Sequence, residues 1–412
     1  MAVRPNRKAT IAIALIIKMA TRKTKISDFT VVDLFAGAGG FSLAAHQCGF
    51  NVVGAIEFDR LASETYQRNI VSKLNKATKL VSRDILEVDA GVFRSHLGLE
   101  KGELDLLVGG PPCQGFSTHR IKNQGVADPR NQLLLRYFDF VKELQPKFFL
   151  IENVPGLLWP RHQLYLQKFK NLAKEAGYKI DGPTRVNAKD YGVPQNRERV
   201  FILGTKQGFD VSQLTWPPAK THGNTQSGLF PWKTASSVFA QPPVQVLTKL
   251  KKIIGNEKVE ELTFGKSLSG KKIDESAIHM AHTRPLKERF AQTPINGGRE
   301  DLAFRLACHK DGYAGHKDVY GRIRLALPGP TMTTGCFNPS KGRFLHPWLD
   351  HGISVRHAAR FQTFPDDYEF SGGITHQGKQ VGNAVPVMLA HAIITEIKLM
   401  LEHATLPNRA IA

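Results

Sequence analysis

The stretch GGPPCQGFS places Cys113 directly after two glycines and two prolines. The apolar run LDLLV at 104–108 leads into this stretch and predicts a strand that ends just before the cysteine. Carboxyl ends of strands in an open α/β sheet face the ligand crevice, and Pro111 and Pro112 restrict the backbone ahead of the thiol. Most cysteines serve packing, but this setting favours a reactive thiol.

Charged side chains follow other predicted strands. Glu152 comes directly after the apolar run FFLI, so its carboxylate is expected in the same crevice as Cys113. Arg197 and Arg199 alternate ahead of the run VFIL, which points both guanidinium groups to one face. Arginines in that position can bind a phosphate or lower the pKa of a thiol. Taken singly, each of these charges is equally compatible with a solvated surface position.

A glycine-rich turn predicts a bound cofactor. The motif DLFAGAGG puts Gly37, Gly39 and Gly40 between a predicted strand and a predicted helix, where a ligand can approach the backbone closely. Glu57 lies 20 residues beyond Gly37, at the end of the second predicted strand, where an acid accepts hydrogen bonds from a ribose. Asp84, after the third strand, is placed to accept from an adenine amino group. The loop is not GxGxxG, so it leaves two adenosine-bearing cofactors open, NAD and S-adenosylmethionine.

The position of Cys113 favours the methyl donor, because an NAD-dependent dehydrogenase gives no role to a cysteine after two prolines. Carbon 5 of cytosine is a poor nucleophile, but addition of a thiolate to carbon 6 makes the ring an enamine that attacks a sulfonium methyl group. A buried Glu152 suits hydrogen bonding to ring nitrogen 3, which stabilises the developing charge. Loss of the carbon-5 proton then expels the thiol. The base must leave the duplex for this chemistry, so base flipping is implied.

The composition indicates a polyanionic partner. The 412 residues include 56 Lys and Arg against 36 Asp and Glu, a net charge of +20, which points to nucleic acid or an anionic membrane surface. Four scattered cysteines without a CxxC argue against a disulfide framework and against a zinc site, and we expect no metal. The apolar run TIAIALII at 10–17 is too short to span a bilayer and lacks a cleavage site. We expect a cytoplasmic protein, with no membrane partner, whose natural start is Met19.

Alternating strand and helix patterns from residue 30 to about 205 predict a doubly wound α/β domain. From there to about 350 the chain is rich in Gly, Pro, Thr and Lys without a sustained period, which predicts a smaller, irregular domain. Helical patterns return at VRHAARFQTF and at NAVPVMLAHAIITEIKLML. The last of these is apolar enough to require burial, so we expect it to pack back on the first domain.

At this point the motifs resemble the DNA (cytosine-5) methyltransferase family, of the bacterial restriction–modification or orphan type. DLFAGAGGFSLA resembles the family's cofactor loop, GGPPCQGFS its catalytic loop and ENV its glutamate motif. QNRERVF, RHAARFQTFPDDYEF and QVGNAVPVMLA resemble later motifs, in the family's order. The resemblance covers residues 30–205 and 353–400.

The resemblance implies a fold, a site and a set of domains. The fold is a Rossmann-like methyltransferase domain with a smaller target-recognition domain, and the substrate is a cytosine flipped out of a specific double-stranded DNA sequence. Cys113 would be the nucleophile, Glu152 the partner of nitrogen 3, and Arg197 and Arg199 the side chains that orient the base and help the thiolate. The implied S-adenosyl-L-methionine site consists of Phe35, Ala36, Gly37, Gly39, Gly40, Glu57, Phe58, Asp84, Ile85, Pro111, Leu133 and Asn383. The implied segments are a basic extension at 1–29, the catalytic domain at 30–205 with a lid at 117–130, the recognition domain at 206–352, a hinge at 353–375 and a returning helix at 376–412.

Two alternative functions share parts of this sequence pattern. A tRNA cytosine-5 methyltransferase branch carries PPCQPF and CFT, whereas this chain has PPCQGFS and CFN, so we favour DNA. A catalytically silent DNA-binding homologue is disfavoured because the cysteine, the glutamate and both arginines are present. We expect a monomer, and any cognate restriction endonuclease would be a separate protein. The DNA target sequence does not follow from the residues.

Overall fold

The computed structural model describes residues 29–112, 132–209, 215–224, 226–268, 275–302 and 318–405. The predicted nucleophile Cys113, the predicted lid at 117–130 and nearly all of the predicted basic extension lie outside these residues. The remaining predicted site residues lie within them.

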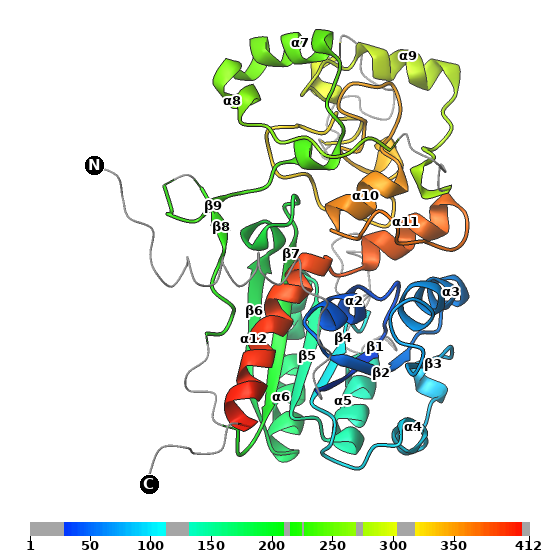
Figure 1. Cartoon of the computed structure of the whole chain (residues 1–412), viewed down its shortest axis with the longest axis vertical. Coiled ribbons are helices and arrows are strands. Elements are labelled where there is room, and N and C mark those ends of the chain that lie inside the picture. Colours follow the sequence, from blue (N-terminus) through cyan, green and yellow to red (C-terminus); the bar gives the residue numbers. More distant parts are fainter. Residues whose placement is uncertain are drawn as a thin grey trace.

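The lower part of the molecule in Figure 1 is a seven-stranded sheet in the order β3-β2-β1-β4-β5-β7-β6. Neighbours from β3 to β5 are parallel, and β7 runs antiparallel to both β5 and β6. This topology confirms the predicted doubly wound α/β fold, whose strand order reverses between β1 and β4. The strands are β1 (Thr30–Leu34), β2 (Asn51–Ile56), β3 (Lys79–Val81), β4 (Leu106–Gly109), β5 (Phe148–Asn153), β6 (Tyr178–Asn187) and β7 (Glu198–Lys206).

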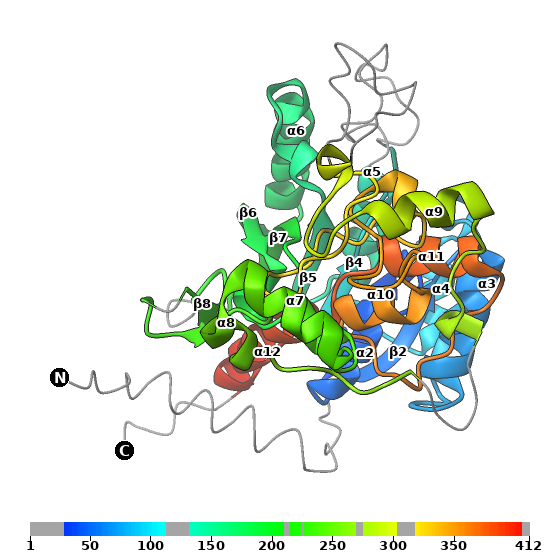
Figure 2. The ribbon, with the colours of Figure 1, turned by 90° about the horizontal axis from the view of Figure 1, so that it is seen from above.

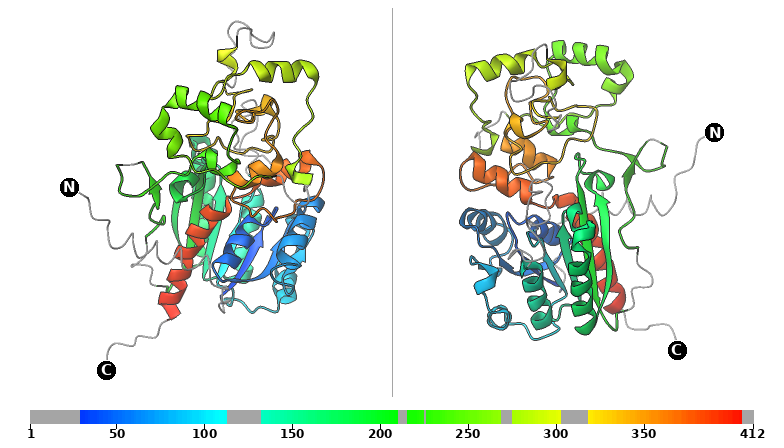
Figure 3. Two further views of the ribbon diagram at one scale, coloured as in Figure 1. Left: turned by 45° about the horizontal axis from the view of Figure 1, so that its top comes forward. Right: turned by 180° about the vertical axis from the view of Figure 1, so that it is seen from behind.

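Helices cover both faces of this sheet and create two hydrophobic cores. Val31 belongs to one core and its neighbour Val32 to the other, because alternate side chains of a strand point to opposite faces. Figure 3 shows the two sides, with α2 and α12 on one and α5 and α6 on the other. The helices of this part are α2 (Gly40–Gln47), α3 (Arg60–Tyr66), α4 (Ala90–Leu97), α5 (Gln132–Leu144), α6 (Gln163–Glu175) and α12 (Val387–Thr405).

Most predicted elements of this part are confirmed, but the sequence patterns missed two of them. The strand β6 carries Gly182 and Pro183, which normally argue against a strand, and a register shift between Asp181 and Thr184 accommodates them. Helix α4 is short and only Ala90 and Phe93 are buried, so it has little apolar periodicity.

The upper part of the molecule lies over the carboxyl edge of the sheet (Figure 2). Its described residues are mostly short helices and loops, and the two-residue strands β8 and β9 lie beside β6 (Figure 1). The hydrophobic core on the α12 side of the sheet continues into the upper part. Phe239 and Phe361 belong to this core, are fully buried and pack with their ring centroids 6.0 Å apart. The elements are β8 (His222–Gly223), β9 (Phe230–Pro231), α7 (Val244–Ile254), α8 (Asn256–Glu260), α9 (Arg284–Gln292), α10 (Val355–Phe361) and α11 (Ile374–Asn383).

One stretch of the described chain, Ile374–Ala404, is long and apolar enough to cross a membrane by length and composition alone. It comprises α11 and most of α12, and α12 packs along α2 against the sheet. Lys398 of this helix donates to the Cys48 carbonyl oxygen at 3.0 Å. These contacts are those of a core helix that packs on the sheet.

Candidate active site at the carboxyl edge of the sheet

A cavity of about 390 Å³ opens where β1, β2, β4 and β5 end, beside the reversal of strand order. Elements distant in the sequence form its walls: the loops after these four strands, the first turns of α2 and α3, and the α11–α12 junction. Of the predicted residues, Phe35, Ala36, Gly37, Gly40, Glu57, Phe58, Pro111, Glu152, Arg199 and Asn383 line it.

The loop Phe35–Gly39, called the cofactor loop here, turns sharply because several of its residues adopt left-handed backbone angles. Phe35, Gly37 and Gly39 have φ values of 58°, 55° and 87°. Gly40 then begins α2, and a Cβ at Gly40 would lie 2.8 Å from the Val385 carbonyl oxygen. Glycine is therefore required at Gly40 for the close approach of α2 to the α11–α12 junction.

Glu57 ties the cofactor loop to the end of β2. Its carboxylate accepts hydrogen bonds from the backbone N–H of Gly37 and of Asp59, each at 2.7 Å. Burial raises the pKa of Glu57, and these two hydrogen bonds partly offset the rise. Each carboxylate oxygen keeps a lone pair, so Glu57 can still accept from ligand hydroxyl groups in the cavity.

The next residues place an aromatic ring and an ion pair at the cavity. Phe58 is 64% exposed although it is a large apolar residue, which leaves its ring available to a planar ligand. Asp59 caps α3 by accepting from two backbone N–H groups and pairs with Lys379 of α11 at 2.9 Å. The pKa of Asp59 is lowered by these partners despite partial burial.

Asp33 lies on β1 next to the cofactor loop and is buried. Its Oδ2 accepts the Ser42 hydroxyl at 2.7 Å. Burial raises the pKa of Asp33 from 3.8 to about 7, an effect opposed by the hydrogen bonds to Ser42 and reinforced by the charge of Glu57.

We expect the free energy of unfolding to vary with pH through Asp33. Since its pKa is higher in the folded than in the unfolded protein, unfolding releases a proton once the pH exceeds 3.8. The stabilisation is therefore complete below that pH and is lost as the pH rises through about 7. Relative to Asp33→Asn, the wild-type protein should lose about 2 kcal/mol between pH 5 and pH 8 in urea unfolding. If the free energy of unfolding varied with pH in the same way in both proteins, Asp33 would not hold a proton in the folded state.

Glu152 and Arg199 form an ion pair on the wall of the cavity. The Nε of Arg199 donates to Oε1 of Glu152 at 2.8 Å, and both side chains are nearly buried. Gly109 of β4 pairs in register with Ile151 of β5, so the residues after each strand lie side by side. Accordingly, a Cβ at Gly110 would lie 3.2 Å from Oε2 of Glu152. The second carboxylate oxygen thus faces the chain that leads to Cys113.

Arg197 lies elsewhere, although the sequence predicted that both arginines contact the same ligand. It is 1% exposed and does not line the cavity. Its Nη1 donates to the Met332 carbonyl oxygen at 2.6 Å. Its Nη2 donates to the carbonyl oxygens of Gly382 and Ala384 at 2.9 and 3.0 Å. Arg197 precedes β7 and joins the Met332 segment to the end of α11, while Arg199 is on β7 beside β5.

We therefore expect Arg197→Lys to destabilise the fold. A lysine keeps the charge but cannot donate to all three carbonyl oxygens, so the change should cost about 3 kcal/mol in urea unfolding. The matched variant Arg199→Lys, on the same chain segment, should cost less stability and instead reduce turnover. If Arg197→Lys had the stability of the wild type but lost turnover, the Arg197 guanidinium would act in the active site and not in the fold.

Four predicted cofactor residues do not line the cavity. Gly39 packs against Tyr66 and Tyr368, and a Cβ there would lie 3.0 Å from the Tyr368 hydroxyl oxygen. The Asp84 carboxylate caps a short turn by accepting from the Leu86 N–H at 3.0 Å. The other two are Ile85, which is buried, and Leu133, which packs against the hydrophobic core on the α5 side of the sheet.

The cavity also contains residues that were not predicted to contact a ligand: Phe41, Asp59, Ala62, Gly110, Pro112, Asn153, Val154, Lys379, Gln380, Gly382, Ala384 and Val385. Asn153 was noted within ENV, and its Nδ2 donates to the Pro111 carbonyl oxygen at 3.3 Å, which fixes the proline pair.

Among the described cysteines, Cys48 and Cys336 are buried thiols. Burial raises the pKa of each to about 12, so neither is a thiolate near neutral pH. The described chain reaches Pro112 on the cavity wall, one residue before Cys113.

Comparison with known proteins agrees with this architecture. The chain is 32% identical to the Type II methyltransferase M.AgeI of Thalassovita gelatinovora, over 89% of this chain and 99% of that protein. It is 31% identical to the Type II methyltransferase M.DdeI of Desulfomicrobium norvegicum, over 92% of this chain and 90% of that protein. A solved structure of a putative DNA modification methyltransferase encoded within a prophage of E. coli superimposes with a TM-score of 0.65 at 25% identity. It covers 91% of this chain and 100% of its own.

The family profile described as C-5 cytosine-specific DNA methylase matches residues 29–399, which span the sheet, the cavity and the upper part. The chain therefore belongs to the C-5 cytosine-specific DNA methylase family and is an enzyme of the DNA (cytosine-5) methyltransferase class.

Proposed function

We propose that this enzyme transfers a methyl group from S-adenosyl-L-methionine to carbon 5 of a cytosine flipped out of a specific double-stranded DNA sequence. The proposed reaction passes through a covalent bond between Cys113 and carbon 6 of the base. The observation that carries the proposal is the Glu152–Arg199 pair, which lies in the wall of a ligand-sized cavity beside the chain leading to Cys113.

The cavity fits an adenosine-bearing methyl donor. Glu57 offers carboxylate lone pairs for ribose hydroxyls, Phe58 offers an exposed ring for the adenine, and the cofactor loop allows close approach. Asn383 and Pro111 would close the pocket from the α11–α12 junction and from the catalytic loop. When bound, S-adenosyl-L-methionine supplies an electrophilic methyl group.

The side chains around the cavity would then act on the base. The Cys113 thiolate adds to carbon 6, and Glu152 protonates or hydrogen-bonds ring nitrogen 3, which takes up the electron density displaced from the double bond. Arg199 holds Glu152 through the 2.8 Å contact and keeps it from turning away. After methyl transfer, a solvent water molecule takes the carbon-5 proton, and the electrons of that bond re-form the double bond and expel the thiolate.

The surface charge suits the DNA backbone. A net charge of +20 favours binding to phosphates with a strong dependence on salt. We assign target recognition to residues 206–352 and base flipping to closure of 117–130, which lie outside or partly outside the described residues. The named relatives are Type II methyltransferases, and we propose a role in a restriction–modification system with a separately encoded endonuclease. We further propose that the protein acts as a cytoplasmic monomer.

Labelled methyl transfer tests the substrate class. With methyl-tritiated S-adenosyl-L-methionine, the enzyme should label duplex DNA and leave a tRNA transcript unlabelled. Bisulfite sequencing of the DNA should then show protected cytosines at one recurring sequence. Labelling of tRNA but not of DNA would replace the proposed substrate, and labelling of neither would contradict the proposed activity.

A further inference from the structure

Tyr368 reaches the cofactor loop from the segment that follows α10. Its hydroxyl donates to the Ala38 carbonyl oxygen, although the two residues are 330 positions apart in the sequence. The ring is buried against Gly39, where a Cβ would lie 3.0 Å from the Tyr368 oxygen. The cofactor loop is therefore held from two sides, by Glu57 at Gly37 and by Tyr368 at Ala38.

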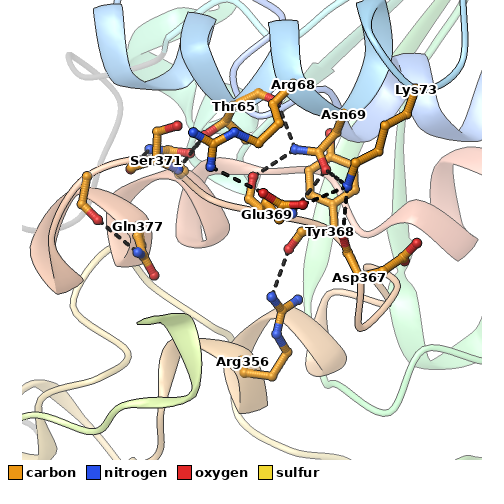
Figure 4. Close-up of polar contacts among 12 residues, drawn as sticks. Thr65, Arg68, Asn69, Lys73, Arg356, Asp367, Tyr368, Glu369, Ser371 and Gln377 are labelled. Carbon is orange, nitrogen blue, oxygen red and sulfur yellow. Dashed lines mark hydrogen bonds and ion pairs between the residues drawn. The ribbon is translucent and has the colours of Figure 1, made fainter. Parts of the chain in front are cut away.

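A set of contacts from the end of α3 and the turn after it fixes the segment that carries Tyr368 (Figure 4). The Asn69 side chain accepts from the Glu369 backbone N–H at 3.0 Å and donates to its carbonyl oxygen at 2.7 Å. Lys73 and Arg68 pair with the Glu369 carboxylate at 3.1 and 3.4 Å. These ion pairs are half exposed and contribute little, so the two hydrogen bonds of Asn69 are the main restraint.

Further contacts connect the same segment to both parts of the molecule. Arg356 of α10 donates to the Tyr368 carbonyl oxygen at 2.8 Å, which links the segment to the upper part (Figure 4). Thr65 accepts from the Ser371 N–H at 2.8 Å and donates to the Gln380 side chain at 2.7 Å. Gln380 lines the cavity, so one buried network joins Tyr368, α3 and the α11 wall of the site.

The cofactor loop needs such support because its backbone is held in an uncommon conformation. Phe35 has a positive φ without being glycine, and Gly37 and Gly39 are also in the left-handed region. Without the Tyr368 hydroxyl, the Ala38 carbonyl loses its buried donor, and that peptide is held only by the Gly39 N–H, which donates to the Ala36 carbonyl oxygen at 2.8 Å. The conformation of the loop that accepts a ligand would then be less populated.

We propose that Tyr368 is a positioning residue for the methyl donor, acting through the Ala38 carbonyl rather than by contact with the reacting atoms. This inference rests on the proposed function, because it assigns the cavity to S-adenosyl-L-methionine. It predicts that the hydroxyl of Tyr368 sets the affinity for the donor and leaves the chemical step unchanged once the donor is bound.

The test compares Tyr368→Phe with Tyr178→Phe in the full-length protein. Both tyrosines are buried and donate to a backbone carbonyl oxygen, but Tyr178 donates to Pro146 at the opposite edge of the sheet. Both changes should lower the melting temperature to a similar extent. Only Tyr368→Phe should raise the KM for S-adenosyl-L-methionine, by about tenfold, with kcat changed less than about twofold. Titration calorimetry with S-adenosylhomocysteine should show the same loss of affinity.

The outcomes separate this inference from the proposed function. The positioning role alone would be overturned if Tyr368→Phe had the wild-type KM for S-adenosyl-L-methionine. It would also be overturned if that KM rose equally in Tyr368→Phe and Tyr178→Phe. A fall in kcat at saturating donor would also overturn it, because the hydroxyl would then act in the chemical step. Failure of the wild-type protein to bind S-adenosyl-L-methionine would overturn the proposed function and this inference together.

Discussion

Glu152→Gln is expected to lower kcat for cytosine methylation by about 10²- to 10⁴-fold, the range typical for loss of a positioned acid or base. Glutamine keeps the size of the side chain and a hydrogen-bond acceptor for Arg199. It cannot carry the proton that stabilises the charge developing on the base. The KM for S-adenosyl-L-methionine should stay near the wild-type value, because Glu57 and the cofactor loop are unaffected.

A matched control lies on the neighbouring strand. Glu198 is exposed and directly precedes Arg199 in the chain. Its carboxylate forms a long ion pair with Arg185, at 3.6 Å. Glu198→Gln should retain full turnover, which separates the chemistry of Glu152 from a general effect of removing a negative charge. Steady-state kinetics on duplex DNA would measure both. If Glu152→Gln kept the wild-type kcat, the carboxyl group of Glu152 would have no role in the chemical step.

Cys113→Ala is expected to abolish methyl transfer, with a loss on the order of 10⁴-fold or more, as seen when a nucleophile is removed. Without the thiolate, carbon 5 of cytosine has no route to nucleophilic character. The protein should still fold and bind DNA, since its net charge of +20 is unchanged. The measurement is transfer of label to DNA, with a gel-shift assay of DNA binding alongside.

Cys48→Ala is the matched control for this substitution. Its thiol is buried between α2 and α12, with the Thr395 hydroxyl at 3.4 Å. This change should reduce stability but not turnover at temperatures where the protein is folded. Loss of turnover in Cys48→Ala at full folding, with activity kept in Cys113→Ala, would reverse the assignment of the nucleophile.

The sequence predicted the parts of the site that follow strands. Continuous apolar runs located β1, β2, β4 and β5, and parallel strands bring their carboxyl ends to one edge. For that reason the patterns pointed to one crevice, and Glu57, Glu152 and Pro111 line one cavity. The strand β7 was also located, which brought Arg199 next to Glu152.

The remaining features depend on contacts between distant residues that no local pattern records. Arg197 has the same local setting as Arg199, yet its partners lie on the Met332 segment and at the end of α11. Tyr368 looked like one of several aromatic residues near α10, and only the folded chain brings it to Ala38. Lys379 reaches the cavity because α11 folds over the sheet, a placement that amphipathic periodicity does not give.

The most direct test of the proposed mechanism is to trap the covalent bond between Cys113 and the base. Once bisulfite sequencing has located the target, its cytosine can be replaced by 5-fluorocytosine in a duplex oligonucleotide. Fluorine cannot leave carbon 5 as a proton, so the thiol is not expelled and the bond should persist. With S-adenosyl-L-methionine present, intact mass spectrometry should show one protein joined to one methylated strand, and peptide mapping should place the bond at Cys113. An enzyme that methylates ordinary DNA but forms no adduct, or a Cys113→Ala protein that still forms one, would contradict the mechanism.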